Sequence, residues 1–182
     1  MQHTHTATHR SSTTRPGRSA TTGDALTLLK ADHAQVKSLF QEFERAHGAQ
    51  RKLHLAQRIC KALKVHTEIE EEIFYPAFLA ATQEQGIHHE AEIEHAEAKD
   101  LIAKIESSTP DDDYFDAKVH VLSEMIRHHV NEEEKRDGMF AHARRSSLDL
   151  KTLGEQMRKR QRELMATDEV LAADIAATIA FI

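Results

Sequence analysis

The sequence has little of what breaks helices or builds sheets and disulfides. Its 182 residues include six glycines, three prolines, one cysteine and no tryptophan, and aromatic side chains make up 5%. Scarce Gly and Pro beside abundant Ala, Leu, Glu, Lys and Gln favour helices over strands. The single Cys60 excludes an internal disulfide, fits a reducing compartment and leaves nitrogen and oxygen atoms to bind any metal. We therefore expect an all-α protein.

Long apolar runs are also missing. No stretch is long enough to cross a bilayer, and the N-terminus lacks the apolar segment of a secretory signal, so we expect a cytoplasmic protein without membrane contact. The formal charge is −6, and residues 1–23 carry three arginines and no acid, which leaves −9 on the remainder (−6 − 3). An acidic body of this kind is not suited to nucleic acid.

The chain divides into three parts. Residues 1–23 show no apolar periodicity and are predicted to be a disordered tail, although their Arg/Ser/Thr-rich, acid-free composition is also that of an organellar transit peptide. Residues 24–145 form a helical bundle, and residues 146–182 form a C-terminal helical extension. That extension ends in a short apolar helix, which packs on the bundle or mediates assembly of a homo-oligomer.

Four amphipathic helices are predicted within the bundle, because apolar residues recur every three or four positions. They run from Asp24 to Gly48, from Gln50 towards Gln83, from Ile87 to Ser107, and from a loop around Pro110 to about Asp137. In the second helix, Ile73 and Ala77 are expected on the inner face, and Pro76 is expected to kink or interrupt the helix.

Metal-ligand residue types interrupt the apolar face of every one of these helices. The interruptions are His33, His66, Glu70, His95, His129 and Glu133. A lone histidine on an apolar face is usually a hydrogen-bonded core residue, but a buried, unpaired glutamate costs several kcal/mol. A shared cation removes that cost because it pairs the carboxylates and uses the imidazole lone pairs.

The sequence repeats this arrangement. The segments DHAQVKSLF, from Asp32, and EHAEAKDLI, from Glu94, share an acid-His-Ala-x-x-Lys-x-Leu pattern, and each is followed by His-x-x-x-Glu. Residues four apart share one helix face, so each His/Glu pair can reach one centre. Two equivalent helical hairpins indicate two metal ions bridged by carboxylates. Mixed imidazole and carboxylate ligands with open positions favour iron, then manganese, over a closed zinc site.

These motifs resemble those of the hemerythrin-like HHE cation-binding family. The matching segments are DALTLLKADHAQVKSLFQEF, VHTEIEEEIFYP, IEHAEAKDLI and HHVNEEE in that order, with LDLKTLGEQM after them, which spans about residues 24–165. The resemblance implies an up-down four-helix bundle around a non-haem di-iron centre. It also implies that the centre binds or senses oxygen, or reacts with oxygen, peroxide or nitric oxide, with enzyme activity left open.

Carried over position by position, the resemblance makes His33 the ligand of the first helix and His95 that of the third. His66/Glu70 and His129/Glu133 become the pairs of the second and fourth helices. Oxygen-carrying hemerythrins have another histidine where this chain has Lys99, which favours a more open, reactive or sensory site over simple oxygen carriage.

Several assignments stay open. His128/Glu132 has the same spacing as His129/Glu133, and we favour the latter because it continues the apolar stripe of the fourth helix. No proline follows Phe140, where the family motif has one. Glu71 and Glu134 are second-layer partners of the ligands, alternative bridging ligands or solvated charges. Tyr75 approaches the metals or only packs.

Two competing functions remain alongside the di-iron protein. One is a ferritin-like di-iron oxidase or iron store, which pairs its ligands as Glu-x-x-His, whereas the predicted pairs here run His-x-x-x-Glu. The other is a metal-free helical interaction module in which the His/Glu faces form a polar network.

Overall fold

The computed structural model describes residues 23–179, and the side chains up to residue 167. Most of the tail predicted at residues 1–23 therefore lies outside the described residues. The described elements are all helical, in the order α1 (Ala25–Glu44), α2 (Ala49–Ile69), η1 (Glu70–Phe74), α3 (Tyr75–Thr82), α4 (Gln85–Glu106), α5 (Phe115–Glu134), α6 (Met139–Arg145) and α7 (Leu150–Ile179). The predicted all-α fold is confirmed.

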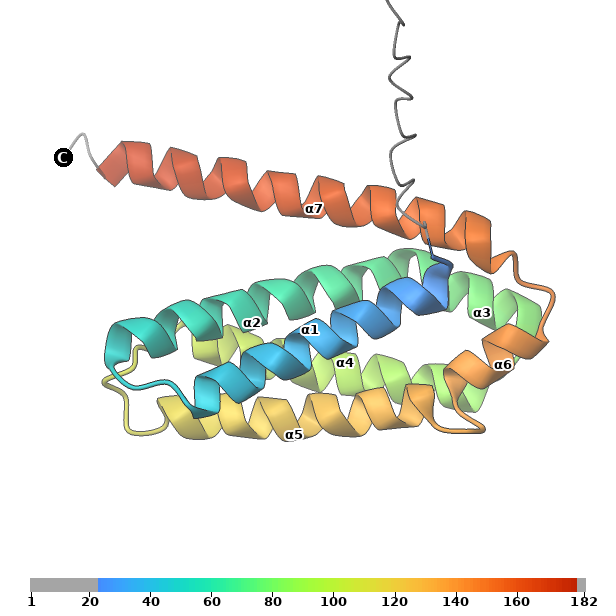
Figure 1. The fold of residues 1–182 in the computed structure, drawn as a ribbon, viewed down its shortest axis with the longest axis horizontal. Coiled ribbons are helices and arrows are strands. Elements are labelled where there is room, and N and C mark those ends of the chain that lie inside the picture. Colours follow the sequence, from blue (N-terminus) through green and yellow to red (C-terminus); the bar gives the residue numbers. More distant parts are fainter. Residues whose placement is uncertain (1–22, 180–182) are drawn as a thin grey trace, which may run out of the picture.

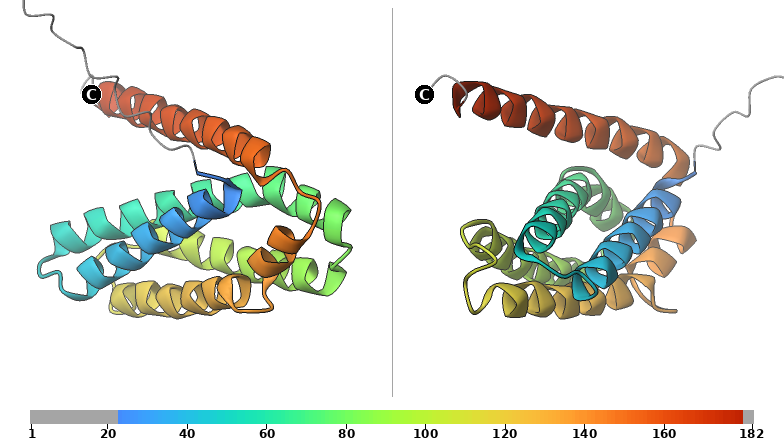
Figure 2. Two further views of the ribbon diagram at one scale, coloured as in Figure 1. Left: turned by 45° about the vertical axis from the view of Figure 1, so that its right-hand side comes forward. Right: turned by 60° about the vertical axis from the view of Figure 1, so that its left-hand side comes forward.

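Four helices form an up-down bundle (Figure 1). α1 packs on α2 and α4 packs on α5, and the two hairpins close the bundle through contacts of α1 with α5 and of α2 with α4. The short helix α6 packs on α5 and α3 at one end, and α7 lies across α1 and α2 on one side (Figure 2). The bundle is thus covered unevenly, because α7 packs against the first hairpin.

Two apolar clusters fill the bundle and leave a polar layer between them. One cluster includes Phe43, Ile59 and Phe115, and the other includes Leu26 and Phe78. Within α1 the second cluster ends at Leu29 and the first begins at Val36, so the layer lies at the level of His33. Apolar packing on both sides excludes water from that layer.

The second predicted helix continues past Pro76, but through a wider turn. In η1 the Tyr75 N–H donates to the carbonyl of Glu70, five residues back, which is a π-helical bond. The extra residue shifts the buried face, so that Phe74, Tyr75 and Phe78 are fully buried and Ile73 and Ala77 are only half-buried. Ile73 and Ala77 still pack against the core on the predicted inner face, but the π-turn places Phe74, Tyr75 and Phe78 deeper inside it.

The C-terminal extension differs from its prediction in one respect. We expected a separate short apolar helix at its end, whereas the backbone forms one helix, α7, from Leu150 to Ile179. Leu153 and Met157 of α7 are buried against the bundle, and Arg158 donates to the carbonyl of Gly23. Within the described residues, no helix is both long and apolar enough to cross a membrane. The proposed self-association rests on side chains beyond residue 167, outside the described part.

α7 docks where its backbone comes very close to the start of α1. A Cβ atom built on Gly154 would lie 2.6 Å from the Ala25 nitrogen and 2.8 Å from the Asp24 carbonyl carbon. Both are backbone atoms, so they cannot give way as a flexible side chain would. Glycine at position 154 therefore permits the contact between α7 and α1.

We expect Gly154→Ala to lower the free energy of unfolding by about 1–3 kcal/mol through this overlap. Chemical denaturation followed by circular dichroism measures the change. Gly86→Ala is the matched control, because a Cβ there meets nothing within 4 Å and alanine favours helix. Equal stability of Gly154→Ala and the wild type would show that α7 does not dock in this way.

Candidate metal centre

The predicted ligand residues converge in the polar layer at the middle of the bundle. All of them are buried, with exposed fractions of 7% or less: His33, His66, Glu70, His95, His129 and Glu133. They come from α1, α2, the first residue of η1, α4 and α5. The structure therefore brings together the whole predicted set, and their role as ligands remains a prediction.

The imidazole rings meet in two pairs through their Nε2 atoms. The Nε2 atoms of His33 and His66 are 3.1 Å apart, and those of His95 and His129 are 3.2 Å apart. The first pair comes from the hairpin α1–α2 and the second from α4–α5. Two nitrogen lone pairs at this distance suit a shared metal ion, which binds imidazole nitrogen at about 2.0–2.1 Å in the case of zinc.

Two carboxylates connect the histidine pairs. Glu70 Oε2 lies 3.2 Å from His66 Nε2 and 3.4 Å from His95 Nε2. Glu133 Oε2 lies 3.3 Å from His33 Nε2 and 3.8 Å from His129 Nε2. Each carboxylate thus reaches one imidazole from either hairpin, as a bridging ligand would.

Possible ligand atoms in this layer form two overlapping groups. One combines His33, His66, Glu70 and Glu133, and the other combines Glu70, His95 and His129, each with atoms within 4.8 Å of one another. Glu70 belongs to both groups.

Two buried oxygens in this layer have no hydrogen-bond partner. They are Glu70 Oε1 and Glu133 Oε2. Leaving a buried carboxylate oxygen unpaired is costly, and a cation in the layer would remove that cost. The donor set of imidazole nitrogen and carboxylate oxygen, together with these two atoms, fits a pair of metal ions.

A second layer of carboxylates faces the outer nitrogen of each imidazole. Glu134 lies 2.8 Å from His33 Nδ1, and Glu71 lies 3.0 Å from His95 Nδ1. Glu94 lies 2.7 Å from His129 Nδ1. A carboxylate at Nδ1 fixes the tautomer with Nε2 free for a metal and makes the ring more basic.

The remaining histidine, His66, has a longer contact between its Nδ1 and a carboxylate. Asp32 lies 3.6 Å from His66 Nδ1, which is beyond hydrogen-bond distance. Asp32 and Glu94 are the acids that begin the two repeated segments, so the repeat carries the signal for this layer. We had not assigned either acid a role from the sequence. Glu71 and Glu134, left open above, are placed here in the second layer.

The charges within the layer depend on one another. Burial alone would lower the pKa of His33, but its contact with Glu133, the charges of Glu133 and Glu70 and its hydrogen bond to Glu134 raise it to about 9. Burial would raise the pKa of Glu70, but the neighbouring histidines, His66 foremost, lower it to about 2. The Glu70 carboxylate thus stays ionised because positive charge lies beside it, which protons or metal ions can supply.

Tyr75 belongs to this layer rather than only to the apolar packing. Its hydroxyl lies 3.2 Å from His95 Nε2, 3.3 Å from Glu133 Oε1 and 3.5 Å from Glu70 Oε2. Burial, followed by the charges of Glu70 and Glu133, raises the pKa of Tyr75 well above its ordinary value, so it remains a hydrogen-bond donor. Its ring stacks on His95, as that of Phe140 stacks on His33 in the other half.

The alternative ligands lie outside the layer. The His128 side chain is 63% exposed and Glu132 is hydrogen-bonded to Lys135, so the structure places His129 and Glu133 at the centre in their stead. Lys99, at the position of the additional hemerythrin histidine, is 2.5 Å from Glu71 and does not point at the imidazoles.

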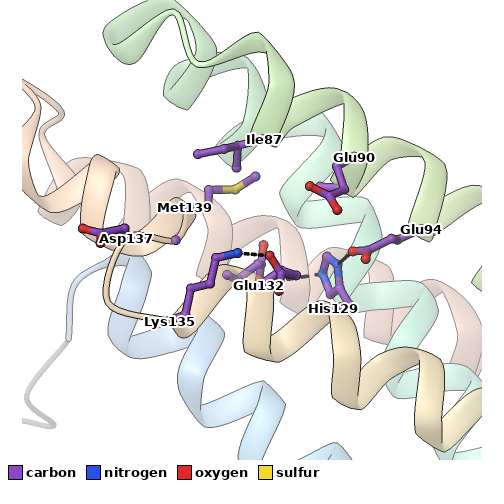
Figure 3. Close-up of a pocket in the computed structure, with 11 residues that line it drawn as sticks. Ile87, Glu90, Glu94, His129, Glu132, Lys135, Asp137 and Met139 are labelled. Atoms are coloured by element: carbon purple, nitrogen blue, oxygen red, sulfur yellow. Dashed lines mark hydrogen bonds and ion pairs between the residues drawn. The ribbon is translucent and has the colours of Figure 1, made fainter.

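Two cavities reach the centre from different sides. A groove of about 610 Å³ between α1 and α5 is lined by His33 and Glu134 at its inner end and by Lys30, Lys37 and Arg127 among others. A smaller pocket of about 90 Å³ between α4 and α5 ends on His129 and Glu133 (Figure 3). Small molecules and ions therefore have short routes to the buried layer.

A helical bundle with a buried layer of paired imidazoles and bridging carboxylates defines a cation-binding protein of the hemerythrin type. The chain belongs to the hemerythrin HHE cation binding domain family, whose model matches residues 24–143. The crystal structure of a hemerythrin HHE cation binding domain-containing protein from Mycobacterium kansasii has a TM-score of 0.68 and 24% identity, covering 80% of this chain and 89% of that one. This similarity supports the fold.

A curated relative is a DNA nickase from Nostoc sp. (strain PCC 7120 / SAG 25.82 / UTEX 2576). It is 30% identical over 107 residues, which cover 59% of this chain and 30% of the nickase. The chain therefore spans about a third of the length of that relative. The nicking activity in its name is a property of the larger protein.

We expect Glu134→Gln to weaken ferrous-ion binding by about 10–100-fold, because a neutral amide supports the His33 tautomer less well than a carboxylate. Anaerobic titration of the metal-free protein measures the affinity. Glu124→Gln is the control, since Glu124 lies on the same helix, lines the same groove and does not touch an imidazole. An unchanged affinity in Glu134→Gln would remove this carboxylate from the site.

Proposed function

We propose that this protein is a non-haem di-iron protein that binds or senses oxygen, or handles peroxide or nitric oxide, at an open coordination position. The observation that carries the proposal is the arrangement of two Nε2 pairs joined by Glu70 and Glu133. His33 and His66 would hold one iron, His95 and His129 the other, and the two carboxylates would bridge them. Iron would supply the electrons and the Lewis acidity.

We favour iron over other metals because the donor atoms of the site are imidazole nitrogens and carboxylate oxygens. Manganese accepts the same nitrogen and oxygen ligands and is the second choice. A structural zinc site is closed by four ligands, whereas the shared carboxylates here leave positions free. No cysteine belongs to the cluster, so the thiolate that would favour zinc or an iron–sulfur cluster is not among its donors.

Free coordination positions on the metals and a groove that leads to them support the binding of a small exchangeable ligand. Six protein side chains do not saturate two six-coordinate ions, and Lys99 is engaged by Glu71 rather than adding a further nitrogen. The groove between α1 and α5 extends to His33, which gives a diatomic molecule or peroxide a way in. These features favour binding, sensing or turnover over oxygen carriage of the five-histidine type.

The ferritin-like alternative finds less support in the contacts. Among the predicted ligands, only His95 has a glutamate three residues before it, Glu92. The Glu92 side chain is 54% exposed and lies 3.4 Å from His88, away from the centre. A metal-free polar network would have to tolerate the unpartnered oxygens of Glu70 and Glu133. We also retain a cytoplasmic location and a role without nucleic acid or membrane as parts of the proposal.

Anaerobic loading with ferrous ion, followed by admission of oxygen, tests the proposal directly. We expect about two bound irons per chain and a visible absorption change on contact with oxygen. Reversal when oxygen is removed would support binding or sensing, whereas an irreversible change with consumption of added peroxide would support an enzyme. Fewer than about one iron per chain after careful loading would refute the di-iron assignment.

We expect Tyr75→Phe to leave the iron count unchanged and to speed the release of bound oxygen or nitric oxide by about tenfold, because a buried hydrogen-bond donor is lost. Stopped-flow absorbance of the iron-loaded protein measures the release. Tyr114→Phe is the matched control, since that side chain is 71% exposed. If both variants release the ligand like the wild type, the Tyr75 hydroxyl only packs.

A further inference from the structure

The pocket between α4 and α5 has an acidic lining that leads from the surface to the centre. Its charged residues are Glu90, Glu94, Glu132, Glu133, Lys135 and Asp137. Lys135 is the one lysine or arginine among the residues that line this pocket, and it is hydrogen-bonded to Glu132. A cleft lined by carboxylates concentrates cations and speeds their arrival.

An outer group of metal-ligand atoms includes two residues of the pocket lining, Glu90 and Glu94, and the neighbouring His128. Glu90, Glu94 and His128 each offer an atom, and the three atoms lie within 4.8 Å of one another. Glu94 connects this outer group with the centre, because its Oε1 lies 3.3 Å from His128 Nε2 and its Oε2 lies 2.7 Å from His129 Nδ1. Figure 3 shows Glu90 and Glu94 on α4 facing His129 on α5.

The inner end of the pocket is a buried carboxylate with one oxygen that has no hydrogen-bond partner. Glu133 is 2% exposed, lines the pocket, and its Oε2 accepts no hydrogen bond. This atom indicates a ligand independently of the surface acids. The pocket volume of about 90 Å³ has room for several water molecules, and hence for a partly hydrated ion.

The repeat within the chain supplies an internal comparison. Aligning the two acid-His segments and the two His-x-x-x-Glu pairs sets Glu90 against Leu28, His128 against Val65 and Glu132 against Ile69. The equivalent face of the first hairpin is therefore apolar, and it is sealed: Leu28 and Ile69 belong to the cluster that includes Met157 of α7.

The acid that begins each repeated segment has different partners in the two hairpins. Asp32, the counterpart of Glu94, accepts a hydrogen bond of 2.9 Å from Gln161 of α7. α7 packs on α1 and α2 of the first hairpin, and in the second hairpin the other oxygen of Glu94 faces His128. The two halves thus have one closed and one open approach to the same layer.

We propose that the pocket between α4 and α5 is the port through which divalent cations reach the centre, with Glu90, Glu94 and His128 as an outer, transient binding site. This inference rests on the proposed iron-binding function. An ion held by the outer group lies beside Glu94, and Glu133 at the inner end receives it next to His129. The equivalent face of the first hairpin, between α1 and α2, offers no such route because α7 and its apolar neighbours close it.

The test is the rate at which the metal-free protein takes up ferrous ion. The protein is mixed anaerobically with ferrous ion, quenched with a chelator at set times, and its bound iron is counted. We expect Glu90→Gln/His128→Gln to slow uptake by about tenfold or more and to reach the wild-type iron count at the end. Both residues are exposed, and circular dichroism checks that the variant is folded.

Glu97→Gln/His120→Gln is the matched control, because it removes the same groups from exposed positions of α4 and α5 outside the pocket. We expect it to load at the wild-type rate. Lys135→Gln removes the cation from the pocket lining and should speed uptake. Higher salt should slow the wild type more than the Glu90→Gln/His128→Gln variant.

The outcomes separate the port from the function. A wild-type chain that binds no iron refutes the proposed function, and the port with it. A wild type and a Glu90→Gln/His128→Gln variant that load equally fast, to the same iron count, refute the port alone. A control variant slowed as much as the port variant would also refute it, because general charge would then explain the effect.

Discussion

The structure depends on two carboxyl groups held away from water. Glu70 is fully buried and Glu133 nearly so, and each has an oxygen without a hydrogen-bond partner. Such groups are tolerated only beside positive charge. Four imidazoles at hydrogen-bond distance provide the surroundings in which protons or metal ions supply that charge. The apolar clusters on either side make the requirement stricter, because they keep out the water that would otherwise solvate the carboxylates.

Successive layers of charged side chains surround these two carboxyl groups, and they account for many of the charged residues in the sequence. Glu71, Glu94 and Glu134 each contact the outer nitrogen of an imidazole, and Lys30 and Lys99 in turn pair with two of them. The hydrogen bond to His95 lowers the pKa of Glu71, so this outer carboxylate stays ionised. Charge therefore alternates from the centre to the surface, and each layer holds the orientation of the one inside it.

Periodicity and repetition in the sequence were sufficient to predict the four helices and the six inward His and Glu positions, because both depend on one helical period. The same reasoning placed Ile73 and Ala77 on the inner face, where they are half-buried, but it missed the deeper burial of Phe74 and Tyr75, because a π-turn adds a residue there. The second layer was predicted only in part: Glu71 and Glu134 were left open as second-layer partners, whereas Asp32 and Glu94 were assigned no role. These residues lie off the apolar stripe and pair between helices, so periodicity alone does not identify them.

The two halves of the chain agree at the ligands and differ around them. His33 stacks on Phe140 while His95 stacks on Tyr75, so a hydroxyl reaches the centre from one side. The first hairpin is sealed by α7, and the second opens through an acidic pocket. The large groove reaches the His33 side, whereas the pocket ends at His129. Equivalent His/Glu sets in unequal surroundings would make the two proposed metal positions chemically distinct, and they give ions and small ligands separate routes to the same buried layer.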